Sequence, residues 1–216
     1  VYPQIAPDNV QRPYIVYQRV TENVENVLAG RTGLTNTRLQ VDVYATTYAQ
    51  AQQIATAVAD LMASHYGLKA GDKVLDIGCG KGFLLYDLTQ AVPGLEVTGL
   101  EISRYAIEHA KPEVKDRNGE GQASSLPLTD GEFDFVFSIN TRHTLPCYDL
   151  DRAFREMMRV GKKHRYLCVE SWRNESEKAN LLYWQLTCRA FFAPDEWEWW
   201  FKQTGYTGDH SFIYFE

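Results

Sequence analysis

The sequence predicts an α/β protein: a doubly wound, mostly parallel sheet with helices on both faces, preceded by a small α+β segment at the N-terminus. Three observations predict this class. From Lys73 onward, short apolar runs alternate with helical patterns, as in βαβ units. A glycine-rich turn joins the first of those runs to a helix. Hydrophobic residues make up 44% of the 216 residues, which is enough for a sizeable core.

The N-terminal third has a different pattern. Residues 1–13 are rich in proline, which favours irregular backbone. Residues 14–20 and 38–45 are predicted strands, and in the second of them apolar and polar residues alternate. Residues 29–33 are predicted to form the loop between them. Residues 46–66 have helical spacing of apolar residues, and Gly67 suits the end of that helix.

The remainder alternates between the two kinds of element. We expect strands at residues 73–77, 96–100, 133–139, 166–170 and 211–216, and helices at 82–91, 103–111, 150–159, 175–192 and from Pro194 to about Gly205. The basic run at 162–165 is predicted to be a solvated turn before a strand.

Composition limits the partners. The net charge is −6 and the pI is near 5.4, which disfavours non-specific binding to nucleic acid or to anionic membranes. No apolar run is long enough to span a membrane, and no signal-peptide pattern opens the sequence. The cysteines form no C-x-x-C pair, which disfavours a metal site and is typical of reduced cytoplasmic thiols. They are Cys79, Cys147, Cys168 and Cys188.

Residues 74–82, Val-Leu-Asp-Ile-Gly-Cys-Gly-Lys-Gly, carry most of the functional information. Glycines at 78, 80 and 82 permit positive φ and a close approach of a ligand to the backbone. The third glycine comes one residue too early for the dinucleotide pattern G-x-G-x-x-G, so a nicotinamide-dependent oxidoreductase is disfavoured. Asp76 would repel a pyrophosphate but suits a ligand with a cationic amine, and S-adenosylmethionine is such a ligand.

Two further segments follow in order. Glu101 ends the next strand about 20 positions beyond the glycines, where a carboxylate can accept hydrogen bonds from both ribose hydroxyls. Residues 121–128, Gly-Gln-Ala-Ser-Ser-Leu-Pro-Leu, precede the strand Phe-Asp-Phe-Val-Phe-Ser-Ile that leads to Asn140.

Together these segments resemble the class I S-adenosylmethionine-dependent methyltransferases over about residues 67–216. The resemblance implies a Rossmann-like fold and S-adenosyl-L-methionine as the cofactor, with a small-molecule methyl acceptor. The cofactor-binding residues that it implies are Asp76, Gly78, Cys79, Gly80, Gly82, Glu101, Ile102, Gln122, Ala123 and Asn140. Gln122 departs from the family pattern, which has Asp there, and the turn at residues 159–165 departs too.

The catalytic candidates are His143, Asn140 and Glu170. His143 suits a general base by its ordinary pKa, with simple packing as the alternative. Glu170 would orient an acceptor amine or hydroxyl, or only cap the strand end. Arg142 suits an anion on the acceptor or is a solvated surface residue. The aromatic segment 183–201 is predicted to be core, although Tyr183 or Trp184 could wall the acceptor pocket.

Residues 1–60 resemble part of a phage tail-completion (minor tail) protein. This resemblance divides the chain into an N-terminal segment, residues 1–66, and a methyltransferase domain, residues 67–216. It implies a fusion with a junction near residues 57–67. Because exposed strands invite further strands, residues 1–45 are expected to be poorly ordered or to mediate self-association. The alternative function is therefore a phage-tail-like structural or assembly protein that carries a non-catalytic methyltransferase fold.

Overall fold

A computed structural model describes residues 2–3, 14–27, 30–44, 47–184 and 188–214. Contacts divide the chain into two compact units, Val1–Ala55 and Thr56–Glu216. The division falls within the helix α1, Tyr48–His65, which occupies most of the predicted helix 46–66. Gly67 follows this helix with φ +59°, as its predicted role at the helix end requires.

The first unit contains a small sheet with the order β1–β2–β3. β1, Tyr2–Pro3, pairs in parallel with β2, Tyr14–Val27, which pairs antiparallel with β3, Gly30–Tyr44. The two predicted strands are confirmed but are much longer than predicted. The predicted loop is wrong for residues 30–33, because they belong to β3, where Gly30 pairs with Val27 and Arg31 with Asn26.

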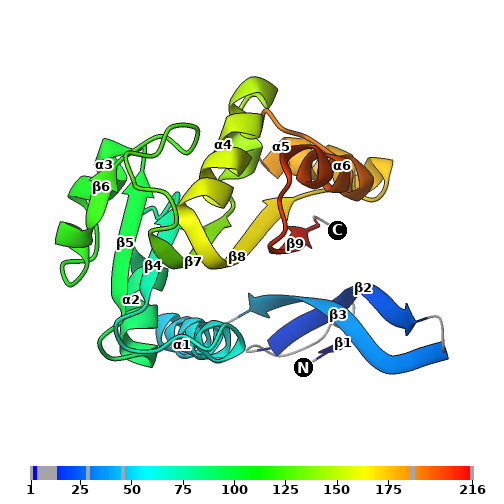
Figure 1. The fold of residues 1–216 in the computed structure, drawn as a ribbon, viewed down its shortest axis with the longest axis horizontal. Helices are drawn as coiled ribbons and strands as arrows, with labels where there is room; N and C mark the ends of the chain where they lie inside the picture. The colour runs from blue at the N-terminus through cyan, green and yellow to red at the C-terminus, as the bar shows by residue number, and fades with distance from the viewer. Residues whose placement is uncertain (1, 4–13, 28–29, 45–46, 185–187, 215–216) are drawn as a thin grey trace. The chain divides into compact units, whose positions relative to one another are not determined.

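The second unit is built on a six-stranded, all-parallel sheet with the order β6–β5–β4–β7–β8–β9 (Figure 1). The bounds are β4 Lys73–Ile77, β5 Glu96–Glu101, β6 Asn118–Glu120, β7 Phe133–Ile139, β8 Gly161–Glu170 and β9 Asp209–Ile213. Successive strands add outward in both directions from the central pair β4 and β7, which is the doubly wound order predicted. β6 was not predicted, since three residues carry no usable periodicity.

Helices lie on both sides of this sheet (Figure 1). They are α2 Phe83–Ala91, α3 Arg104–Glu108, α4 Cys147–Val160, α5 Glu175–Trp184 and α6 Pro194–Thr204. Side chains of α1 and α2 pack with Phe135 and Phe137 of β7 in one buried cluster. α4 packs on β8 and α6, where the Phe154 and Phe201 rings meet edge to face. The carboxyl ends of β4, β5 and β7 share one edge, where ligands bind in such sheets.

Two predictions near the C-terminus are wrong. Residues 162–165 belong to β8 and are not a turn: Lys162 and Lys163 extend from the exposed start of the strand to the Asp134 carboxylate, at 3.4 and 3.2 Å. The helix predicted at 175–192 ends at Trp184, and residues 188–193 have no regular structure. The backbone N–H groups of Arg189 and Ala190 bond instead to the His143 carbonyl oxygen.

Candidate functional site

The glycine-rich turn after β4 has the geometry that its sequence predicts. Gly78, Gly80 and Gly82 all have positive φ, at +88°, +54° and +74°. The Gly78 N–H donates to the Leu100 carbonyl oxygen at 2.7 Å, which ties the turn to the end of β5. A Cβ at Gly78 would lie 2.0 Å from Oγ1 of Thr141, so this turn approaches the segment after β7 as closely as a glycine allows.

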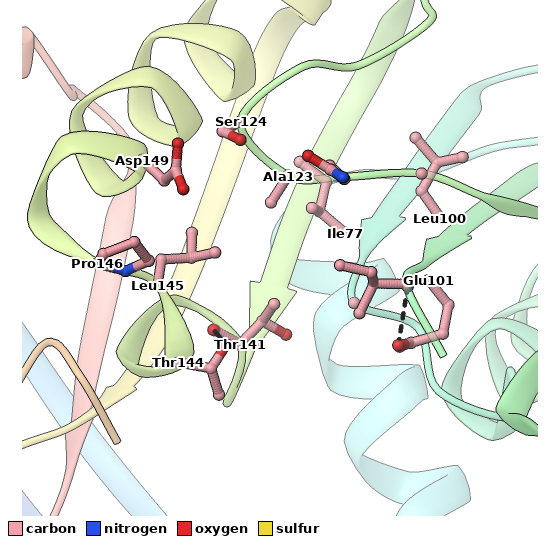
Figure 2. A pocket seen from close by; sticks show the side chains of 14 residues that line it. Ile77, Leu100, Glu101, Ala123, Ser124, Thr141, Thr144, Leu145, Pro146 and Asp149 are labelled. Carbon is pink, nitrogen blue, oxygen red and sulfur yellow. Dashed lines mark hydrogen bonds between the residues drawn. The ribbon is translucent and has the colours of Figure 1, made fainter. Parts of the chain in front are cut away.

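Glu101, at the end of β5, is held by three backbone donors. Its Oε2 accepts from the Gly80 N–H, and its Oε1 accepts from the N–H groups of Ile102 and Ser103, all at 2.9 Å. Figure 2 shows Glu101 at the edge of the cavity described below. These bonds orient the carboxylate without neutralising it with a cation. Lone pairs remain for further donors, because an ionised carboxylate has about four acceptor positions.

Asp76 lies behind the turn and is buried. Burial, together with the nearby Glu101 charge, raises the pKa of this carboxyl well above its ordinary value. The same environment raises the pKa of the Cys79 thiol to about 12, through burial and then the charges of Asp76 and Glu101. Cys79 is therefore an uncharged thiol at neutral pH. The site has an excess of negative charge, which a cationic ligand would relieve.

A cavity of about 340 Å³ opens at this edge of the sheet (Figure 2). Its lining residues are Ile77, Gly78, Leu100, Glu101, Ile102, Gly121, Gln122, Ala123, Ser124, Thr141, Thr144, Leu145, Pro146 and Asp149. Of the predicted cofactor residues, Gly78, Glu101, Ile102, Gln122 and Ala123 line it. The others do not line it; they are Asp76, Cys79, Gly80, Gly82 and Asn140. The Gly80 N–H donates to Glu101, and Gly82 is the N-cap of α2.

Most residues at the end of the cavity opposite Glu101 were not predicted from the sequence. Thr144, Leu145, Pro146 and Asp149 come from the turn after β7 and the first turn of α4, and Ser124 lies near them (Figure 2). The usable signal was position alone, because residues that follow the carboxyl end of β7 must reach this edge. Thr141, which follows Asn140 after β7, also lines the cavity, whereas the catalytic candidates Asn140, His143 and Glu170 do not.

The catalytic candidates His143 and Glu170 lie together but away from the cavity lining. His143 Nδ1 contacts Glu170 Oε2, and both side chains are buried. The Trp197 Nε1–H donates to the Glu170 carbonyl oxygen at 3.1 Å, so α6 covers the strand end. The segment before α6 covers His143, because the N–H groups of Arg189 and Ala190 donate to the His143 carbonyl oxygen. The geometry supports an imidazole oriented by a carboxylate.

Asn140 and Arg142 both lie in the segment that follows β7, but their surroundings differ. Asn140 is the one non-glycine residue with positive φ, +52°, among those described, and its N–H donates to the Cys168 carbonyl. Asn adopts this left-handed backbone more readily than most residues other than glycine. Arg142 is not a surface residue, so that expectation is wrong, and it does not line the cavity. It is fully buried, its Nη2 lies 3.6 Å from Met157 Sδ, and burial lowers its pKa to about 10.

The aromatic segment is chiefly core. Trp197 and Phe201 are buried, and their rings stack at 6.3 Å between centroids. Tyr183 is 87% exposed and does not line the cavity, and the Trp184 side chain lies outside the described residues. None of the described helices is long and apolar enough to cross a membrane. Within the same residues no cluster of His, Cys, Asp or Glu is arranged to hold a metal ion.

Comparison with known families finds a match for each part of the chain. Residues 75–169 match the family model described as a methyltransferase domain, in agreement with the resemblance seen in the sequence. Residues 1–89 match the model described as tail completion protein gp17. The second match confirms the N-terminal resemblance and extends beyond it, so that the two matches share residues 75–89.

Individual relatives agree with the domain assignment. The chain is 34% identical over 116 residues to 27-O-demethylrifamycin SV methyltransferase of Amycolatopsis mediterranei, covering 50% of this chain and 42% of that protein. It is 32% identical over 125 residues to 2-methyl-6-phytyl-1,4-hydroquinone methyltransferase of a Synechocystis species, covering 55% and 38%. The chain thus spans under half the length of these curated relatives. A geranyl diphosphate methyltransferase solved with its methyl donor shares the fold, with TM-score 0.60, 17% identity and coverage of 72% and 66%.

Proposed function

We propose that this chain transfers a methyl group from S-adenosylmethionine to a small-molecule acceptor. The observation that carries the proposal is the Glu101 carboxylate, fixed by three N–H groups at one end of a cavity that the glycine-rich turn also lines. A cavity of about 340 Å³ lies within the range of roughly 300–1,000 Å³ for small-molecule sites. The curated relatives are named for small-molecule substrates.

The residues present fit this cofactor. Its ribose hydroxyls would donate to the open lone pairs of Glu101, and its amine would bring a positive charge near Asp76. Gly78 has no Cβ, which lets the Thr141 side chain lie directly against the turn, and both residues line the cavity. Gln122 and Ala123 line the cavity beside the position expected for the adenine, where the Gln122 amide oxygen can accept from an amino group.

The cofactor supplies a methyl group on a sulfonium, ready for in-line displacement. The protein has to align the acceptor atom with that methyl group and exclude water. We infer that His143 removes the acceptor's proton where the acceptor is a hydroxyl, and that Glu170 orients the imidazole through their contact. His143 is buried, so this role requires the segment at residues 188–193 to move when the acceptor binds.

The test uses methyl-labelled S-adenosylmethionine and the small-molecule fraction of a cell extract. The full chain should move label into that fraction, and Glu101→Ala should not. His143→Gln should lower the rate by roughly 100-fold while leaving S-adenosylhomocysteine affinity unchanged, as expected for a proton-transfer residue. Label transfer that does not depend on Glu101 would contradict the cofactor assignment. Full activity of His143→Gln would contradict the assignment of the base.

We also infer a cytoplasmic location, because Cys79, Cys147, Cys168 and Cys188 are all free thiols.

The tail-completion match favours a second role, self-association through residues 1–45. β3 is a fifteen-residue edge strand of its described sheet, and long edge strands invite a strand from another copy. Light scattering of the full chain should show oligomers that a proline substitution in β3, such as Val41→Pro, dissociates. A monomer at all concentrations, with the amides of residues 14–44 uniformly protected from exchange, would contradict this role.

A further inference from the structure

Two carboxylates line the cavity, those of Glu101 and Asp149. The other described residues that line it include no Lys, Arg or His. In Figure 2 Asp149 lies on the same side of the cavity as Ser124, Leu145 and Pro146, across from Glu101 and Leu100. Glu101 belongs to the cofactor end described above. Asp149 is therefore the charged side chain at the end left for the acceptor.

Asp149 has little to neutralise it. It lies in the first turn of α4, and its N–H donates to the Pro146 carbonyl at 2.9 Å. Its cationic neighbour is Arg152, whose Nη1 lies 3.7 Å from Oδ1 and whose side chain is 69% exposed. An exposed pair at this distance is weak. The start of a helix weakly favours an acidic side chain, which makes Asp149 tolerable but does not explain why it lines the cavity.

The surrounding side chains define the rest of the acceptor end. Leu145 and Pro146 give it an apolar wall. The Thr144 hydroxyl donates to the Thr141 carbonyl at 2.8 Å, so its own lone pairs are available to a donor from a ligand. A phosphate or carboxylate here would meet negative charge at both ends of the cavity, with no cationic lining residue to offset the repulsion.

From this arrangement we propose that the methyl acceptor carries a cationic amine on an apolar body, and that Asp149 is its counter-ion. The inference rests on the proposed methyltransferase function and specifies the chemical class of its acceptor. Asp149 acts here as a specificity residue. It discriminates by charge, attracting an ammonium and repelling an anion of the same shape.

Two probes of equal shape and opposite charge test the proposal. Tyramine and 3-(4-hydroxyphenyl)propionate share a phenol ring and chain length, but one ends in an ammonium and the other in a carboxylate. Saturation-transfer NMR on the full chain, with and without S-adenosylhomocysteine, measures both. We expect tyramine to bind at least about tenfold more tightly. Asp149→Asn should remove that preference and retain S-adenosylhomocysteine binding.

Asp151→Asn is the matched control. Asp151 lies on the same helix and pairs with Arg155 at 3.0 Å on an exposed face, outside the cavity lining. This variant should keep the preference for tyramine. The proposal is overturned if the wild-type chain does not favour tyramine, including if neither probe binds. It is also overturned if Asp149→Asn keeps the preference or loses S-adenosylhomocysteine. A tyramine preference without any S-adenosylhomocysteine binding would instead contradict the proposed function alone.

Discussion

The two ends of the cavity are built in different ways. The cofactor end depends on backbone: positive-φ glycines, and N–H groups that converge on Glu101. The acceptor end consists of side chains on a turn and a helix start, such as Thr144 and Asp149. Backbone geometry restricts the sequence tightly, whereas a pocket wall accepts many side chains. A domain of this kind can therefore keep its cofactor and change its acceptor.

The largest expected effect comes from Gly78→Ala at the cofactor end. Its φ of +88° strains any other residue, and the new Cβ would lie 2.0 Å from Thr141 Oγ1. We expect affinity for S-adenosylhomocysteine to fall by about 100-fold or more, or ~2.7 kcal/mol, measured by calorimetry. Gly80→Ala is the matched control for backbone strain, because its φ is also positive, at +54°, but its Cβ would meet nothing within 4 Å. If Gly78→Ala binds as well as Gly80→Ala, close backbone approach does not build this end.

Asp76→Asn should affect stability and binding in opposite directions. The pKa of Asp76 is raised in the folded protein, so the folded state holds this proton more tightly than the unfolded state. The free energy of unfolding therefore falls as the pH rises from about 4, the ordinary Asp value, through the raised folded pKa. Asp76→Asn removes this loss of stability, because the amide does not ionise. The unliganded variant should therefore melt at a higher temperature than the wild type at neutral pH.

In the same variant, S-adenosylhomocysteine affinity should fall by roughly tenfold, because the amine of the ligand loses a nearby carboxylate. Thermal melts at several pH values, with and without ligand, measure both effects. A variant that is less stable than the wild type across this pH range would show that the Asp76 charge is compensated in the folded chain.

Arg142→Met should give the smallest effect. The Arg142 guanidinium is buried, and its Nε and Nη1 have no hydrogen-bond partner among the described residues. Replacing a poorly compensated buried charge by an apolar chain of similar length is often neutral or stabilising, here by about 1 kcal/mol. Chemical denaturation measures this change, and cofactor affinity should stay constant. Destabilisation by more than ~2 kcal/mol would show that Arg142 has a role in the fold that its contacts do not reveal.

The contrast between the two ends also explains what the sequence could predict. Gly78 and Glu101, which line the cavity, could be selected from the sequence because the backbone geometry there demands particular residues at fixed spacing. Asp149 was missed because a first-turn acid is ordinary on any helix. The turn predicted at residues 162–165 was wrong because the charged side chains extend to solvent and to Asp134 from the start of an otherwise buried strand. The extent of β2 and β3 was underestimated. Residues 21–27 and 30–37, which the prediction left out, do not alternate between apolar and polar side chains.

Calorimetric titration of the full chain with S-adenosylhomocysteine, alongside Glu101→Gln, tests the central claim most directly. Glu101→Gln keeps the shape of the side chain but replaces the charged carboxylate that would accept hydrogen bonds from the ribose hydroxyls. Glu120→Gln controls for the loss of a surface charge, because Glu120 forms an exposed pair with Arg104. We predict one site with roughly micromolar affinity, weakened at least about tenfold by Glu101→Gln and unchanged by Glu120→Gln. A folded chain that gives no binding heat, or equal affinity in all three proteins, would contradict the assignment of this cavity to the cofactor.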